Sequence, residues 1–216
     1  MKKNKALLDD DSLLFREDNP RGVPLRFDSR KIIAIGASTG GTEAVFSILK
    51  QLPHNIPGIL VVQHIPPMFS RMFAERLNNQ TGLIVSEAED GDYVEEGKVL
   101  VAPGDYHMKV KKTGERYRVE VFRGERVNGH CPSVDILFES LAKEAGNNAV
   151  GVILTGMGSD GARGLLTMRK KGARTIGQDE KSCVVYGMPK VAYEIGAVEK
   201  QTSLGNIPKT LISMLK

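Results

Sequence analysis

Residues 32–41 read IIAIGASTGG, and this stretch decides the fold class and the kind of site. The apolar run 32–37 predicts a strand that is buried on both faces. Ser38 follows in a loop of small residues, and a helical pattern begins at Thr42. A strand, a glycine-rich loop and a helix in this order can hold a phosphate, bind a dinucleotide or expose a nucleophile. The remaining sequence has to distinguish these three kinds of site.

The strand–loop–helix unit recurs along the chain. Further strands are predicted from apolar runs at residues 58–64, 83–88, 98–104, 149–156 and 173–179. Helices are predicted from amphipathic or proline-initiated segments at residues 42–52, 66–78, 134–145, 162–171, 189–195 and 208–216. Residues 106–123 alternate in character around Thr113-Gly114, which predicts an antiparallel hairpin. We therefore expect an α/β fold of three layers, α/β/α, with a mostly parallel, doubly wound sheet and the hairpin as an excursion.

The composition excludes several classes of protein. Hydrophobic residues make up 41% and charged residues 26%, as in ordinary globular proteins, and the net charge of +4 comes from scattered basic residues. No nucleic-acid-binding motif, metal-ligand motif or membrane-length apolar run occurs, and the acidic start of the chain does not suit a signal peptide. Cys131 and Cys183 lie far apart and are expected to be free thiols in a reducing compartment. A cytoplasmic protein without membrane insertion is therefore expected.

Residues 1–30 differ from the rest of the chain because they are dense in charges of both signs. We expect them to form a tail or linker, with a short helix within residues 7–17. The periodic pattern starts at Lys31, so the folded domain is predicted to span residues 31–216.

Two of the three readings of the opening loop fail on detail. GASTGGT resembles the dinucleotide loop of short-chain dehydrogenases, and Tyr186 and Lys190 have the YxxxK spacing of their catalytic pair. However, Thr42 stands where the third glycine is needed, and no acidic residue ends the second strand to bind a ribose. Pro189 also prevents Tyr186 from continuing into a helix. No GxxxxGK[ST] motif is present, so a nucleotide triphosphatase is not expected.

The third interpretation is that the loop exposes a nucleophile. Residues 36–40, GASTG, satisfy the GxSxG pattern directly between a predicted strand and a predicted helix. Small neighbours allow a sharp turn that exposes the Ser38 hydroxyl, and the following helix presents free N–H groups and its positive dipole end to an oxyanion. A serine in such a loop is also an ordinary cap or turn residue, so the pattern needs a base and a carboxylate.

A base and a carboxylate are available at the same edge of the sheet. His64 ends one predicted strand, Asp160 lies in the loop after another, and the carboxyl ends of parallel strands meet at one edge. Ser38 is then the nucleophile, His64 the base that takes its proton, and Asp160 the group that orients the imidazole. Asp160 is also placed to cap the helix that begins at Ala162. The other histidines are interpreted as structural: His54, His107 and His130.

Five segments in this order resemble the chemotaxis-receptor methylesterases, the CheB type, over roughly residues 30–216. These segments are IGASTGG, VVQHIP, LVAPGDYHM, HCPSVDILFESLA and ILTGMGSDGARGL. The resemblance implies that Ser38 is the nucleophile, His64 the general base and Asp160 the third member of the triad. It also implies a set of residues that support the oxyanion or the site, namely Thr39, Gly40 and Met157.

The implied reaction is the hydrolysis of glutamate γ-methyl esters on the cytoplasmic helices of chemoreceptors, with release of methanol. Many members also deamidate receptor glutamines. Both reactions are acyl transfers through a seryl intermediate, so no cofactor and no metal is expected. Typical members begin with a phospho-accepting receiver domain, whereas residues 1–30 are expected to be a tail or linker. A receiver domain or another chemotaxis signalling protein is expected as a further partner. The residues alone leave two alternatives open: a serine esterase or amidase for a small molecule, and a signalling adaptor with an idle triad.

Overall fold

The computed structural model describes residues 26–216. Residues 1–25, and with them the helix expected within residues 7–17, lie outside the described residues, as does most of the expected tail. The first regular element, β1, begins at Ile32. Within residues 26–216, no helix is both long and apolar enough to cross a membrane.

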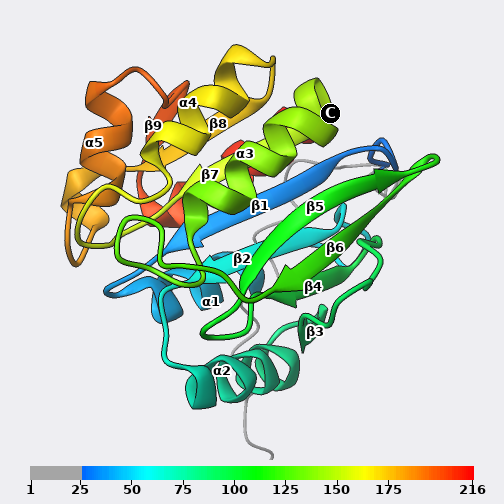
Figure 1. The fold of residues 1–216 in the computed structure, drawn as a ribbon. Helices are drawn as coiled ribbons and strands as arrows, with labels where there is room; N and C mark the ends of the chain where they lie inside the picture. The colour runs from blue at the N-terminus through cyan, green and yellow to red at the C-terminus, as the bar shows by residue number, and fades with distance from the viewer. Residues whose placement is uncertain (1–25) are drawn as a thin grey trace, which may run out of the picture.

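A single sheet of seven strands forms the centre of the molecule (Figure 1). Its strands, in spatial order, are β3 (Ile84–Glu87), β4 (Lys98–Val101), β2 (Ile59–Gln63), β1 (Ile32–Ala37), β7 (Ala149–Ile153), β8 (Arg174–Gln178) and β9 (Lys200–Thr202). Every neighbouring pair is parallel. The short edge strand β9 is an addition to the predicted elements, because its sequence KQT has no apolar run that would predict a strand.

Helices cover both faces of this sheet, which confirms the three-layer α/β/α fold. One face packs against α1 (Gly41–Leu49), α2 (Pro67–Gln80) and α6 (Ile207–Leu215). The other face packs against α3 (Val134–Glu144), α4 (Ala162–Lys170) and α5 (Met188–Glu194). The two faces separate cleanly along β1, where Ile33 and Ile35 belong to the first cluster and Ile32 and Ala34 to the second. This alternation is what a strand buried on both sides requires.

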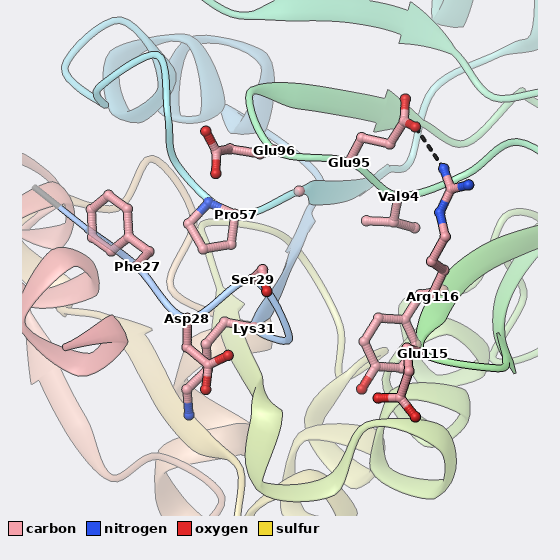
Figure 2. Close-up of a pocket in the computed structure, with 12 residues that line it drawn as sticks. Phe27, Asp28, Ser29, Lys31, Pro57, Val94, Glu95, Glu96, Glu115 and Arg116 are labelled. Carbon is pink, nitrogen blue, oxygen red and sulfur yellow. Dashed lines mark hydrogen bonds and ion pairs between the residues drawn. The ribbon is translucent and has the colours of Figure 1, made fainter.

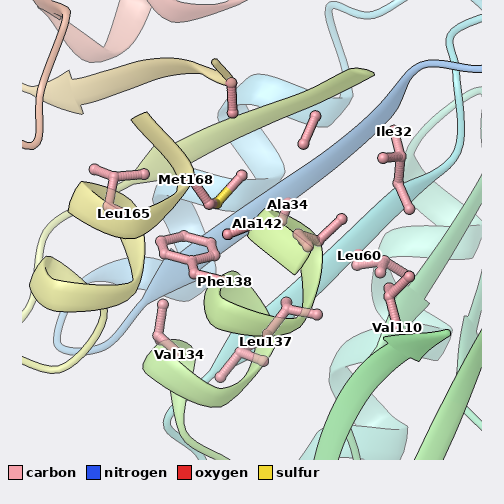
Figure 3. Close-up of a cluster of buried hydrophobic side chains, with 14 of the residues drawn as sticks. Ile32, Ala34, Leu60, Val110, Val134, Leu137, Phe138, Ala142, Leu165 and Met168 are labelled. Carbon is pink, nitrogen blue, oxygen red and sulfur yellow. The ribbon is translucent and has the colours of Figure 1, made fainter. Parts of the chain in front are cut away.

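The predicted hairpin forms a separate two-stranded sheet, β5 (His107–Thr113) and β6 (Arg116–Phe122), beside α3. Its apolar side chains, including Val110, join the cluster that contains Phe138 of α3 and Leu60 of β2 (Figure 3). The Ser140 hydroxyl of α3 also accepts a hydrogen bond of 2.8 Å from the Val110 N–H. The hairpin thus covers part of a sheet face in the way that a helix does elsewhere in the fold.

The connectivity reverses direction beside β1. From β1 the chain adds β2, β3 and β4 on one side of the sheet, and then β7, β8 and β9 on the other side. In doubly wound folds, ligands generally bind at the carboxyl ends of the two strands that flank such a reversal, here β1 and β7. Ser38 directly follows β1 and Asp160 lies in the loop after β7.

Among the described residues, Phe138 is the largest side chain that is completely buried, so its truncation tests the packing of α3 on the sheet. We expect Phe138→Ala to lower the free energy of unfolding by about 3–5 kcal/mol, because it removes buried apolar surface and leaves a cavity. Urea unfolding followed by circular dichroism measures this change. The matched control is Phe69→Ala, because Phe69 is 53% exposed on α2. Equal losses in the two variants would contradict this account of the core.

Candidate active site

Ser38 and His64 leave neighbouring strands at the same level. Ala37 of β1 is paired in register with Gln63 of β2, so the next residue on each strand is Ser38 and His64, respectively. The His64 N–H donates a hydrogen bond of 3.0 Å to the Ala37 carbonyl. On the other side of β1, the Ser38 N–H donates a hydrogen bond of 3.0 Å to the carbonyl of Thr155, which follows β7. Ser38 therefore lies where the two halves of the sheet meet.

The loop that carries Ser38 is tightly constrained. Gly40 adopts a left-handed conformation, with φ of 78°, directly before α1. The Gly41 N–H donates to the Ser38 carbonyl at 2.7 Å, and the Thr155 hydroxyl donates to the Thr39 carbonyl at 2.9 Å. A β-carbon built on Gly156 would lie only 2.7 Å from Ser38 Cβ, so this position has no room for a side chain. The two loops at the ends of β1 and β7 are therefore in direct contact at Ser38.

Gln63 ties the loop of Ser38 to the start of the loop that carries His64. Its buried Nε2 donates to the Ser38 carbonyl at 2.9 Å and to the His64 carbonyl at 3.1 Å. Its Oε1 is buried and has no hydrogen-bond partner within residues 26–216. This role of Gln63 was not predicted from the sequence. A glutamine at the end of the wholly apolar strand ILVV is nevertheless a signal, because a buried amide needs hydrogen-bond partners.

His64 and Asp160 are brought together by the fold. His64 Nε2 lies 2.8 Å from Asp160 Oδ2, and the exposed fractions of the two side chains are 7% and 0%. Because an ionised carboxylate only accepts hydrogen bonds, Nε2 carries the proton of this bond. His64 Nδ1 is buried and has no hydrogen-bond partner within residues 26–216. Nδ1 is thus the ring nitrogen left to accept a proton, and it is not hydrogen-bonded to Ser38 in this state.

The carboxylate of Asp160 lies at the amino end of α3. Oδ2 accepts a hydrogen bond of 2.7 Å from the Val134 N–H, and Oδ1 accepts one of 3.2 Å from the Asp135 N–H. The Ser133 hydroxyl and the Asn128 amide also donate to Oδ1, at 2.8 and 3.0 Å. Asp160 was expected to cap α4, but the N-cap of α4 is Gly161, without any side-chain cap. Asp160 instead satisfies the free N–H groups of α3, a helix far from it in sequence.

This environment keeps Asp160 ionised. Burial acts to raise the pKa of Asp160, but the hydrogen bonds from His64, Asn128, the Val134 N–H and Ser133 outweigh it and lower the pKa to about 2. The positive end of the α3 dipole favours the same charge. At neutral pH the side chain of Asp160 is therefore a fixed negative charge against Nε2 of His64.

Of the residues expected to support an oxyanion, Thr39 and Gly40 directly follow Ser38, and Met157 follows Gly156, the glycine that abuts Ser38. Thr39 is exposed, Gly40 precedes α1, and Met157 is 72% exposed in the loop after β7. The two residues of the YxxxK pattern do not share a helix. Tyr186 lies before α5, which begins at Met188, whereas Lys190 lies within α5.

Neither cysteine is part of a disulfide, and burial raises the pKa of Cys183 to about 11, which keeps this thiol protonated. Within the described residues, no group of three or more His, Cys, Asp or Glu side chains is placed to hold a metal ion.

A separate pocket lies at the opposite edge of the sheet (Figure 2). Gly58 and Lys31 line it, and these residues directly precede β2 and β1. Its wall also includes the ion pair of Glu95 and Arg116, with Oε1 and Nη2 separated by 2.7 Å. Since Ser38, His64 and Asp160 follow the carboxyl ends of their strands, this pocket is not part of the candidate active site.

The lowered pKa of Asp160 predicts a pH-dependent contribution to stability. The pKa falls from 3.8 to about 2 on folding, so the stabilising effect is complete above about pH 4 and is lost as the pH falls through about 2. We expect Asp160→Asn to lower the free energy of unfolding by about 2 kcal/mol at pH 7, with a smaller difference at pH 3. Urea unfolding at both pH values measures it. Glu96→Gln, at an exposed position, is the control, and a difference that does not shrink at pH 3 would contradict the prediction.

Comparisons with known proteins identify the family to which the chain is similar. A family model described as CheB methylesterase matches residues 33–211. The protein-glutamate methylesterase/protein-glutamine glutaminase 2 of Syntrophomonas wolfei is 60% identical over 188 residues, which cover 87% of this chain and 55% of that protein. The corresponding Escherichia coli protein is 51% identical over 187 residues, covering 87% of this chain and 54% of that protein.

A solved structure of a CheB methylesterase catalytic domain is also similar to this chain. The crystal structure of the Thermotoga maritima CheB methylesterase catalytic domain superposes with a TM-score of 0.83 at 38% identity, covering 85% of this chain and 98% of that one. The chain spans about half the length of the curated relatives that it matches. Both the sequence matches and the shared architecture lead to one conclusion: this chain belongs to the CheB methylesterase family.

Proposed function

We propose that this chain is a serine hydrolase that demethylates glutamate γ-methyl esters on the cytoplasmic helices of chemoreceptors. The observation that carries the proposal is the buried hydrogen bond between His64 and Asp160, at the same sheet edge and strand level as Ser38. The names of the relatives supply the substrate class, because they describe protein-glutamate methylesterases. The general chemistry of a buried imidazole–carboxylate pair beside a serine is acyl transfer.

The first half of the reaction forms an acyl-enzyme. Ser38 Oγ attacks the ester carbonyl carbon while its proton passes to Nδ1 of His64, which becomes an imidazolium. The fixed negative charge of Asp160, held by α3, stabilises this cation through Nε2. When the tetrahedral intermediate collapses, the carbon–oxygen bond to the methoxy group breaks, and the leaving oxygen takes the proton from Nδ1 to give methanol.

The second half of the reaction is hydrolysis of the acyl-enzyme. A water molecule gives its proton to Nδ1 and attacks the acyl carbon, and Ser38 Oγ then leaves with that proton. The product is a free glutamate side chain, and only water is consumed. In both halves an oxyanion forms, and we assign its stabilisation to the backbone N–H groups near Thr39, Gly40 and Met157, together with the positive end of α1.

The same steps with an amide in place of the ester would release ammonia and convert glutamine to glutamate. The names of the relatives include protein-glutamine glutaminase, which supports this second activity for the same site. A receiver domain or another chemotaxis signalling protein is the further partner that we propose, because the curated relatives are about twice as long as the matched region.

Ser38→Ala tests the nucleophile. We expect turnover to fall on the order of 10⁶-fold, because a triad without its nucleophile retains only the catalysis that comes from binding and the oxyanion site. Release of labelled methanol from methylated receptor membranes measures the rate, and circular dichroism checks the fold. Ser213→Ala is the control, since Ser213 is exposed on α6 and its hydroxyl donates to the Thr210 carbonyl of the same helix. Methanol release by Ser38→Ala at a rate comparable with Ser213→Ala would exclude this mechanism.

Gly156→Ala tests the contact between the loops after β1 and β7. The new methyl group would lie 2.7 Å from Ser38 Cβ and 2.4 Å from Met188 Sδ, so the loops must move apart. We expect a loss of kcat on the order of 100-fold, because small displacements of reacting groups are costly. Gly205→Ala is the matched control, since within residues 26–216 no atom beyond its chain neighbours lies within 4 Å of a β-carbon built there. An unchanged kcat in Gly156→Ala would show that Ser38 tolerates displacement.

A further inference from the structure

A turn between β6 and α3 reaches both His64 and Asp160. The N–H groups of Val127 and His130 each donate to the carbonyl of the other residue, at 3.0 and 2.9 Å, which closes a two-residue turn. Asn128 and Gly129 at its centre have positive φ values of 52° and 81°, the combination found in type I′ turns. Asn128 donates its amide to Asp160 Oδ1 at 3.0 Å, and His130 contacts His64.

The contact between His130 and His64 is a face-to-face stack. The ring centroids are 3.7 Å apart and the ring planes differ by 8°. The hydrogen bond to Asp160 fixes only one atom of the His64 ring, and the χ2 torsion of a histidine is soft, so the hydrogen bond alone would let the ring pivot. A ring packed flat against His64 restricts this pivot, because tilting would either collide with it or lose the contact.

We propose that His130 is a positioning residue, which fixes the ring plane of His64 and so limits the orientations in which Nδ1 can meet the Ser38 hydroxyl. The inference rests on the proposed function, since it assigns no role to His130 unless His64 is the base. His130 itself exchanges no proton with substrate. His130 increases the fraction of time in which the His64 imidazole has a reactive orientation. It therefore affects kcat rather than substrate binding.

The neutral form of His130 suits this role. Burial lowers the pKa of His130, the neighbouring His64 and Arg126 lower it further, and Asp160 opposes them. A neutral ring stays in contact when His64 takes up the Ser38 proton, whereas a protonated His130 would repel the imidazolium. The stack can therefore persist through every step of the cycle.

Three substitutions at His130 separate stacking from other roles. His130→Ala removes the stack, His130→Leu fills much of the volume without a planar face, and His130→Phe keeps a planar ring that cannot titrate. We expect His130→Ala and His130→Leu to lower kcat on the order of 10-fold to 100-fold with little change in KM. We expect His130→Phe to restore most of the wild-type kcat. His54→Ala is the control, because the His54 ring is hydrogen-bonded to the Gly82 carbonyl, outside the candidate active site.

The assay is methanol release from methylated receptor, with the rate of fluorophosphonate labelling of Ser38 as a second readout that does not depend on the receptor. Circular dichroism identifies any variant that fails to fold. If His130→Ala fails to fold, the comparison of His130→Leu with His130→Phe still tests the inference. A wild-type kcat in His130→Leu, or a kcat in His130→Phe as low as in His130→Leu, would overturn the inference. Ser38→Ala is measured in parallel. If Ser38→Ala stays active, the proposed function itself is wrong. If Ser38→Ala is inactive and His130→Leu is fully active, only the role of His130 is wrong.

Discussion

The site depends on one interaction, in which the carboxylate of Asp160 lies at the amino end of α3 while bound to His64. The free N–H groups of a helix end need acceptors, and a buried carboxylate needs donors, so each satisfies the other. The two carboxylate oxygens of Asp160 accept hydrogen bonds from five residues, namely Val134, Asp135, Ser133, Asn128 and His64. A stabilising contact of the fold and the electrostatic support of the imidazole are therefore the same set of hydrogen bonds.

Glycines make this arrangement sterically possible. A β-carbon on Gly36 would lie 2.2 Å from Val134 Cγ1, and one on Gly161 would lie 2.5 Å from the same atom. The first turn of α3 therefore rests directly on β1 and on the loop after β7. The first glycine of the GxSxG pattern thus serves the close approach of a helix, rather than the turn at Ser38 for which the sequence pattern suggested it. The glycine at position 40, with its positive φ, is the one that the turn requires.

Much of the fold could be predicted from the sequence because it follows from local periodicity. Apolar runs predicted all strands of the central sheet except β9, whose three residues carry no such signal. The meeting of His64 with Asp160 followed from a topological rule about parallel sheets. What could not be predicted depends on contacts between residues far apart in sequence. These are the capping of α3 by Asp160 in place of α4, the tie made by Gln63, and the stack of His130, which had been interpreted as a structural histidine.

The in-register pairing of Ala37 with Gln63 has a consequence for how the family can vary. Because side chains alternate between the two faces of a strand, inserting or deleting one residue within β1 or β2 would send either Ser38 or His64 to the wrong side of the sheet. Length changes at the opposite edge, in the loops that lead into these strands, leave this count untouched. Insertions in natural homologues should therefore collect at the amino ends of the strands, and the residue count from the start of β1 to Ser38 should be invariant.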